Sequence, residues 1–215
     1  MIQFTKSDFQ KLAKIPKINL INGCTGYKSA NLLVTKSKDN VTNVAIFSSI
    51  THLGSEPALL GFILRPATVQ RNTYQNIKEN LYFTVNHVTA AMISDAHHTS
   101  ASYDEFISEF DKTNLEEEYV DDIAIPFVKG SPVQLLCKYV NEYEIIENGT
   151  IHLIASIEQI NVAENIIQKE NWLRLDLENV VTVSGLDAYC LPKVIDRFDY
   201  ARPNVPTKSM LKNGS

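Results

Sequence analysis

The chain has 215 residues, a length that fits one domain, and its middle contains no linker-like stretch. Hydrophobic residues make up 44% of the chain, and the net charge of −5 argues against a broad nucleic-acid surface. No apolar run approaches the roughly 18 residues that span a bilayer. The first residues lack the charged-then-apolar layout of a secretory signal. We therefore expect one cytoplasmic domain over residues 1–215 that binds neither nucleic acid nor membrane.

After an N-terminal extension over residues 1–24, the first third of the chain predicts strands. Residues 31–35 are apolar and β-prone, Lys38-Asp39-Asn40 supplies turn residues, and residues 41–50 continue as a second strand. This pattern indicates a hairpin. Residues 58–64 are almost wholly apolar, as is typical of a strand that is buried on both faces.

The pattern becomes helical after Pro66. Asn72 with Gln75 three residues later resembles a capping box, so we expect a helix that runs to about Asn80. Arg71 directly precedes this helix. Spacing alone favours a solvated cation beside a capped helix over a role for Arg71 in binding an anion.

The middle of the chain predicts a strand over residues 81–86 and a short helix over residues 89–95. Residues 102–110 are polar, acidic and aromatic, which is typical of a surface helix or loop. We interpret the acidic stretch over residues 104–122 as a solvated face.

The second half returns to strands. Residues 133–146 and 150–162 flank Glu147-Asn148-Gly149, and Asn-Gly between two β-prone runs is a strong hairpin signal. A shorter strand is expected over residues 180–183, and the tail over residues 203–215 is expected to be flexible or to cross a partner. The fold class predicted by these elements is mainly β, an antiparallel barrel with a few short helices.

Three sequence features exclude common chemistries. Cys24, Cys137 and Cys190 are too widely spaced for a metal or redox pair. Residues 23–29 carry two glycines, but their spacing is wrong for a phosphate-binding loop. The adjacent histidines 97 and 98 would point in different directions, so no metal site is expected.

Two segments are suited to a phosphorylated heterocycle. Residues 43–49 place small or polar groups among apolar ones within a strand, which can offer donors to a flat polar ring. Residues 71–77 place a cation and a hydroxyl at a predicted helix N-terminus, where free N–H groups and the helix dipole attract phosphate.

A set of motifs, in order along residues 25–205, resembles the flavin reductase-like family of FMN-binding split-barrel proteins. The motifs are Asn43-x-Ala45-x-x-Ser48-Ser49, Pro57-Ala58-Leu59-Leu60-Gly61-Phe62, Arg71-Asn72-Thr73-x-x-Asn76-Ile77, Phe83-Thr84-Val85-Asn86, Ala96-His97-His98-Thr99-Ser100-Ala101, Ser108-Glu109-Phe110, Pro132-Val133-x-x-Leu136-Cys137 and Gly185-Leu186-Asp187-Ala188-Tyr189. The stretch from Ala96 to Phe110 is similar to that of a bacterial subgroup. Three places depart from the family pattern. Glu56-Pro57-Ala58 has one proline where the family often has two, His98 stands where Gln is expected, and Asn72 stands where Asp is commoner.

The resemblance implies a Greek-key split barrel and a homodimer with FMN at or near the subunit interface. It implies that the strand from Asn43 to Ser49 faces the flavin, that Arg71, Thr73 and Arg65 are candidates for the phosphate, and that Asn76 anchors backbone. The implied cofactor-binding residues are Asn43, Ala45, Ile46, Phe47, Ser48, Ser49, Arg65, Arg71, Thr73, Asn76, His97, Thr99 and Ser100.

The implied function is an NAD(P)H:flavin oxidoreductase that passes hydride from NADH or NADPH to the flavin N5 atom. No catalytic residue is named, because in such proteins the cofactor supplies the reactive atom. Two alternatives remain open. One is an electron carrier like flavoredoxin, with tightly held FMN and a redox partner protein, and the other is a flavin-binding protein without turnover. Residues 197–206 are a candidate cover for the flavin.

Overall fold

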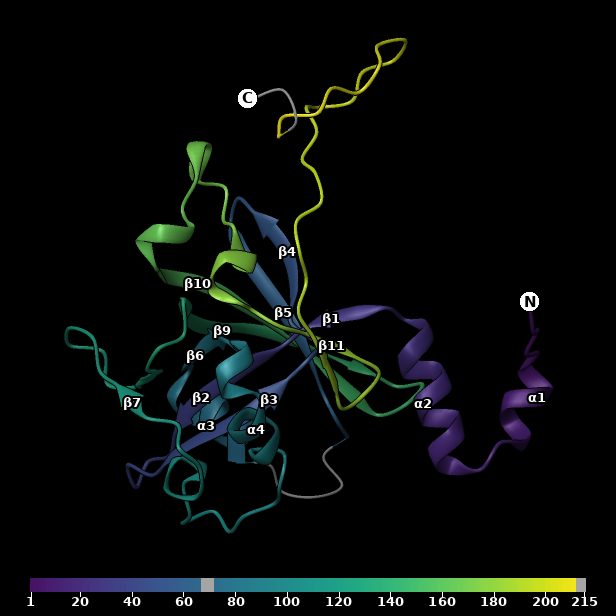
Figure 1. The fold of residues 1–215 in the computed structure, drawn as a ribbon. Helices are drawn as coiled ribbons and strands as arrows, with labels where there is room; N and C mark the ends of the chain where they lie inside the picture. Colours follow the sequence, from purple (N-terminus) through teal and green to yellow (C-terminus); the bar gives the residue numbers. More distant parts are fainter. Residues whose placement is uncertain (67–71, 212–215) are drawn as a thin grey trace.

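The computed structural model describes residues 1–66 and 72–211, and a seven-stranded antiparallel sheet forms its centre (Figure 1). The strand order is β3-β2-β6-β9-β10-β5-β4. The strands are β2 (Asn31–Lys36), β3 (Thr42–Phe47), β4 (Thr51–Ser55), β5 (Ala58–Leu64), β6 (Tyr82–His87), β9 (Val133–Ile145) and β10 (Thr150–Val162). The predicted mainly β, antiparallel architecture is confirmed.

The sheet curls into a split barrel because its two edge strands are consecutive in the chain. Residues 48–50 join β3 to β4, and three residues span at most about 10 Å. Seven strands laid flat would separate these edges by about 29 Å. Ser49 closes the gap: its hydroxyl accepts a hydrogen bond from the Ile63 N–H at 3.0 Å and donates to the Ile63 carbonyl at 3.3 Å.

Both predicted hairpins are present. In the first, β2 pairs with β3 from Asn31 opposite Phe47 to Lys36 opposite Thr42. The observed strand β3 is shorter than the predicted range 41–50, because the chain leaves the sheet after Phe47 to cross to β4. In the second hairpin, β9 pairs with β10, and Gly149 adopts the positive φ of 69° that its turn needs.

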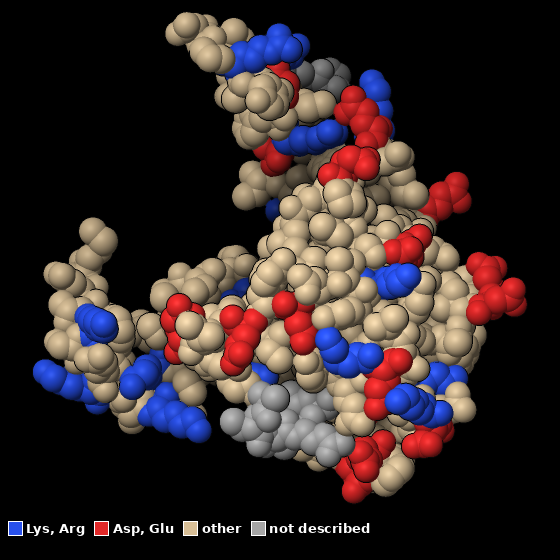
Figure 2. All heavy atoms as spheres, turned by 180° about the vertical axis from the view of Figure 1, so that it is seen from behind, with Lys and Arg blue, Asp and Glu red and all other residues tan. Residues whose placement is uncertain are grey.

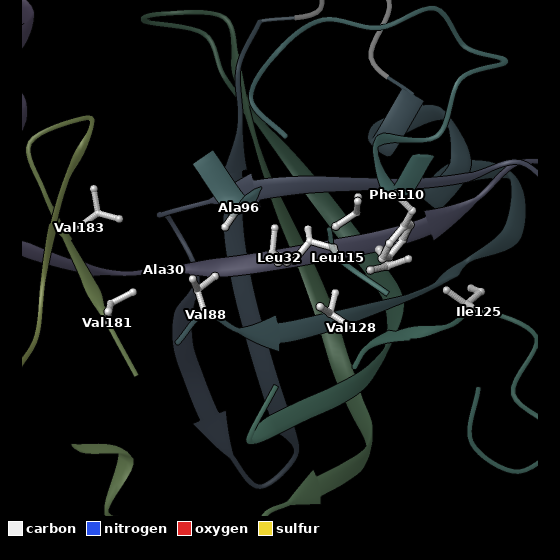
Figure 3. Packing of buried hydrophobic residues seen from close by; sticks show 12 residues of the cluster. Ala30, Leu32, Val88, Ala96, Phe110, Leu115, Ile125, Val128, Val181 and Val183 are labelled. Carbon is white, nitrogen blue, oxygen red and sulfur yellow. The ribbon is translucent and has the colours of Figure 1, made fainter. Parts of the chain in front are cut away.

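Apolar side chains fill both faces of the strongly buried strand β2. On the inner face, Phe62 is fully buried between Phe47 and Phe83, at ring-centroid distances of 5.4 and 5.7 Å. On the opposite face, Leu32 is covered by Ala96 and Phe110, which belong to segments that cross over the sheet (Figure 3). These crossing segments place residues 96–110 beside β3.

The shorter elements lie around this barrel. The remaining strands are β1 (Tyr27–Ser29), β11 (Thr182–Ser184) and β12 (Ala188–Cys190), which form one sheet, and the pair β7 (Glu117–Glu118) and β8 (Phe127–Val128). The helices of the barrel region are α3 (Asn72–Asn80), α4 (Ile93–His98), η1 (Ala90–Met92), η2 (Glu109–Lys112), η3 (Glu164–Ile166), η4 (Lys169–Asn171) and η5 (Leu175–Glu178). The helix predicted to run to about Asn80 is confirmed. The helix expected over residues 89–95 begins as the 3₁₀ turn η1 and continues as α4 to His98.

The acidic stretch over residues 104–122 differs from the solvated face that we expected. Phe110 and Leu115 belong to the hydrophobic core, and Ser108 and Glu109 are buried. The interpretation holds for most of the acidic residues, such as Asp104, Asp111 and Asp122, which are exposed. It was wrong for residues 108–110 and 115, because it gave no weight to the apolar residues that draw this part onto the outer face of β2 and β3.

Both ends of the chain stand away from the barrel (Figure 1). The N-terminal extension forms α1 (Lys6–Lys11) and α2 (Lys14–Cys24), which bury no residue, and the sequence pattern did not predict them. The C-terminal tail exposes large apolar side chains such as Ile195 and Tyr200. Among the helices of the described residues, none is long and apolar enough to cross a membrane.

Candidate functional site

The free edge of β3 is the centre of the candidate site. β3 pairs with β2 on one side, so alternate residues point their backbone groups away from the sheet. Val44 is one of these residues, since its N–H donates to the Glu109 carboxylate at 2.9 Å. Two residues on, Ile46 points its backbone N–H and C=O from the same edge. These groups have no hydrogen-bond partner within the part of the chain that the structure describes.

A buried hydrogen-bond network links this edge to the helix α3. The Asn43 side-chain amide donates to both Glu109 oxygens at 2.8 Å. The Asn43 carbonyl oxygen accepts from the Thr73 hydroxyl at 2.8 Å and from the Thr35 hydroxyl at 3.5 Å. The Asn76 amide then donates to the Thr35 hydroxyl at 3.0 Å. All five side chains are buried, so one continuous network fixes β2, β3, α3 and η2 relative to one another.

This network occupies three of the residues that the resemblance implied for the flavin. The side chains of Asn43, Thr73 and Asn76 are buried and hydrogen-bonded to protein groups. Because the hydroxyl proton of Thr73 is directed at Asn43, any contact of Thr73 with phosphate would use its backbone N–H in the first turn of α3. Asn76 was expected to anchor the local backbone, but its amide bonds to the side chain of Thr35 on β2 and so links α3 to the sheet.

The remaining strand residues divide between the two faces of β3. Ala45 and Phe47 share the inner face with Asn43, and Phe47 packs edge-on against Phe62. Ile46 packs against the outer core cluster, and the Ser49 hydroxyl is used in barrel closure. The half-buried Ser48 hydroxyl has no protein partner among the described residues.

The histidine segment lies beside the outer face of β3. In α4, the His97 Nδ1 atom lies 3.2 Å from the Tyr189 hydroxyl, and the buried Thr99 hydroxyl donates to the Ala96 carbonyl at 2.7 Å. Ser100 follows at the exposed end of the helix. His98 faces a different partner, Tyr103, at 2.7 Å, as expected for adjacent histidines. No group of metal ligands is found in residues 1–66 and 72–211.

The two arginines expected to bind phosphate cannot both be placed. Arg65 is exposed at the end of β5. Arg71 lies outside the described residues. The first residue of the helix that follows is Asn72, so α3 begins directly after Arg71 in the chain.

A hollow of about 260 Å³ lies at the other end of the network, between the β2–β3 turn, α3 and residues 105–107. Asn43 and Asn76 contribute to its wall, together with three acidic residues, Asp39, Glu79 and Glu105, against the one basic residue Lys38. It is smaller than typical cofactor pockets, and these acidic groups would repel a phosphate. We therefore place the candidate flavin site at the free β3 edge and not in this hollow.

Two buried polar atoms near the end of β3 also lack partners. The Asn31 side-chain oxygen and the His87 Nδ1 atom have no hydrogen-bond partner among the described residues, and Asn31 pairs in register with both Phe47 and His87. Buried polar groups without partners are uncommon in native proteins. Burial lowers the pKa of His87 to about 4, which keeps its ring neutral at physiological pH.

Sequence reasoning missed Glu109 as a residue of the site. Its carboxylate is buried, and burial raises its pKa, although the bonds from Val44 and Asn43 oppose that rise. The one signal in the sequence was the Ser108-Glu109-Phe110 motif, which includes Glu109 in the family resemblance.

The comparisons with known proteins identify the family and the fold. Residues 25–175 match the model of the flavin reductase like domain. The chain belongs to the flavin reductase-like family. A candidate flavin reductase with a split barrel domain from Shewanella frigidimarina NCIMB 400 is 37% identical, covers 94% of this chain and 100% of its own, and superposes with a TM-score of 0.90.

Two further solved structures share the fold at lower identity. Flavoredoxin of Desulfovibrio vulgaris (Miyazaki F) is 19% identical, with a TM-score of 0.67 and coverage of 83% of this chain and 91% of its own. An FMN-binding protein from Thermus thermophilus is 10% identical, with a TM-score of 0.68 and coverage of 89% and 96%. The split-barrel fold implied by the sequence resemblance is thereby confirmed.

A flavin fits the donor set of this flavin reductase-like chain. The unpaired N–H and C=O of Ile46 match the alternating donors and acceptors on the pyrimidine edge of an isoalloxazine ring. The hydroxyl of Ser48 lies two residues further along the chain, and the first turn of α3 supplies N–H groups that have no partner within the helix and suit an anion. The network through Asn43 and Thr73 joins these two places.

Proposed function

We propose that the protein binds FMN at the free edge of β3 and acts as an NAD(P)H:flavin oxidoreductase. The observation that carries the proposal is that the backbone N–H and C=O of Ile46 have no hydrogen-bond partner among the described residues. The Asn43–Thr73 bond joins the same strand to the N-terminal turn of α3. The family match and the 37% identical candidate flavin reductase support the same class of reaction.

In this proposal the chain binds and orients rather than reacts. The backbone of Ile46 and the hydroxyl of Ser48 hold the polar edge of the ring, and the first turn of α3 with Arg71 or Arg65 holds the phosphate. Bound FMN would supply the group that accepts hydride from NADH or NADPH. The absence of an assigned acid–base pair is consistent with that division of roles.

We also propose that the protein is a homodimer with the flavin near the subunit interface. The extension over residues 1–24 carries four lysines and one aspartate, a side-chain charge of +3, which leaves −8 on the remainder of the chain. Figure 2 shows the basic residues gathered on this projecting segment. Its apolar side chains Ile15 and Ile21 are exposed, and a second copy offers both the opposite charge and a surface to cover them.

The dimer predicts a measurable change on truncation. The full-length chain should sediment as a dimer of about twice 24.2 kDa, and a variant that lacks residues 1–24 should sediment mainly as a monomer at the same concentration. Replacing the four lysines of the extension with glutamate should weaken the dimer in the same direction. A full-length chain that sediments as a monomer at micromolar concentration would contradict the proposal.

The function is tested by anaerobic reduction. The protein is saturated with FMN, which should absorb at about 450 nm, and NADH and NADPH are added separately. Rapid loss of this absorption with either nucleotide is the expected result. Loss with dithionite alone would favour the flavoredoxin-like carrier with a protein electron donor, and FMN fluorescence that does not change on addition of protein would exclude flavin binding.

A further inference from the structure

Glu109 is a buried carboxylate with an unusual position. Its side chain is 4% exposed, and it lies against the free edge of β3 at the point where that strand has no neighbouring strand. Burying a carboxylate costs free energy unless hydrogen bonds replace its water. Here two donor groups do so through three hydrogen bonds, one from the Val44 N–H and two from the Asn43 amide, which reaches both oxygens.

These bonds make Glu109 a substitute for a short piece of an eighth strand. By accepting the Val44 N–H, it satisfies one outward group of β3 that a neighbouring strand would otherwise pair, and it does not reach Ile46. Two residues beyond Val44, the half-buried Ile46 has a backbone N–H and C=O without partners among the described residues. A strand edge in this state is a template for a hydrogen-bonding ligand of flat shape.

The same carboxylate sets the position of the helix α3. It orients the Asn43 amide, and the fixed Asn43 oxygen accepts the Thr73 hydroxyl in the first turn of α3 at 2.8 Å. The Asn76 bond to Thr35 repeats this link one turn later. Glu109 thus stands at one end of a chain of bonds whose other end is the expected phosphate site.

We propose that Glu109 is a positioning residue for flavin binding. Glu109 holds the β3 edge and the first turn of α3 in the relative position that allows the ring and the phosphate of FMN to bind at the same time. The inference rests on the proposed flavin binding at this edge. It assigns to Glu109 no contact with the flavin itself and no part in electron transfer.

The first test is Glu109→Gln. The introduced amide can still accept the Val44 N–H with its oxygen, but its NH₂ group then faces the Asn43 NH₂ group, so two donors oppose each other. We expect the FMN dissociation constant to rise by about tenfold or more, because a charge-assisted bond is lost and a donor is left unpaired. The riboflavin dissociation constant should rise less, so that the preference for FMN over riboflavin falls toward one.

The second test restores the complementarity. In the double variant Glu109→Gln with Asn43→Asp, the introduced amide donates to the introduced carboxylate, which also accepts the Thr73 and Thr35 hydroxyls. We expect both the FMN affinity and the preference over riboflavin to return to within about threefold of the original protein. Asn43→Asp alone places two carboxylates in contact and should be at least as damaging as Glu109→Gln alone.

The matched control is Glu117→Gln. Glu117 also bonds to β3, since it accepts the Thr42 hydroxyl at 2.5 Å, but it has no link to Asn43 or α3. This variant should leave both dissociation constants within about twofold of the original values. Urea unfolding of every variant reports stability separately from binding.

The outcomes separate the two proposals. If the original protein binds neither FMN nor riboflavin, the proposed function fails. If it binds both and Glu109→Gln raises both dissociation constants by the same factor, Glu109 is a structural residue only and the positioning role is overturned. The positioning role is also overturned if Glu109→Gln changes neither constant, or if the double variant does not recover the preference for FMN.

Discussion

Phe62→Ala should lower the free energy of unfolding by about 4 kcal/mol, because it removes a large ring from the centre of the inner core. The Phe62 ring is fully buried and meets Phe47 and Phe83 edge-on at centroid distances of 5.4 and 5.7 Å. These contacts tie β5 to β3 and β6 across the closed barrel, so the cavity cannot collapse without moving three strands. Urea unfolding at neutral pH measures the loss.

The control for this prediction is Phe106→Ala. Phe106 is 68% exposed, so its loss should change the free energy of unfolding by less than about 0.5 kcal/mol. If Phe62→Ala costs no more than the control, the three-ring contact does not hold the barrel closed.

Stability should fall by about 2 kcal/mol between pH 7 and pH 5 through His87 alone. Burial lowers the pKa of His87 from 6.5 to about 4 in the folded chain, whereas the unfolded chain binds the proton near the ordinary value. The unfolded state therefore binds more protons in this window. The contribution of His87 to stability is fully present above pH 6.5 and is lost as the pH falls toward 4.

The histidine contribution is isolated by comparison with His87→Gln. The free energy of unfolding of each protein is measured at pH 7 and at pH 5, and the drop should be about 2 kcal/mol smaller in the variant. An equal drop in both proteins would show that the His87 ring takes up its proton as readily in the folded chain as in the unfolded one.

The fold could largely be predicted from the sequence. The apolar run at residues 58–64, the Asn148-Gly149 turn and the helix that begins at Asn72 each carry a local signal that the tertiary structure reinforces. The N-terminal helices could not be predicted in this way, because they bury no face and so lack an amphipathic pattern.

The sequence predicted which motif residues lie close together but not which groups they bond to. The motif residues Asn43, Thr73, Asn76 and Glu109 do meet in space, as their shared membership of one pattern suggested. A sequence does not tell whether a polar residue in a motif contacts a ligand or another protein group. Here the side chains bond to one another. The backbone N–H and C=O of Ile46, on the strand that they position, have no partner among the described residues.

The central claim is that flavin occupies the edge of β3, and hydrogen exchange at Ile46 tests it directly. In the free protein the Ile46 amide has no partner among the described residues and should exchange rapidly. With FMN bound, the account predicts that this amide slows by at least about tenfold, together with amides in the first turn of α3. FMN that binds and leaves exchange at Ile46 unchanged would contradict the account, wherever else protection appeared.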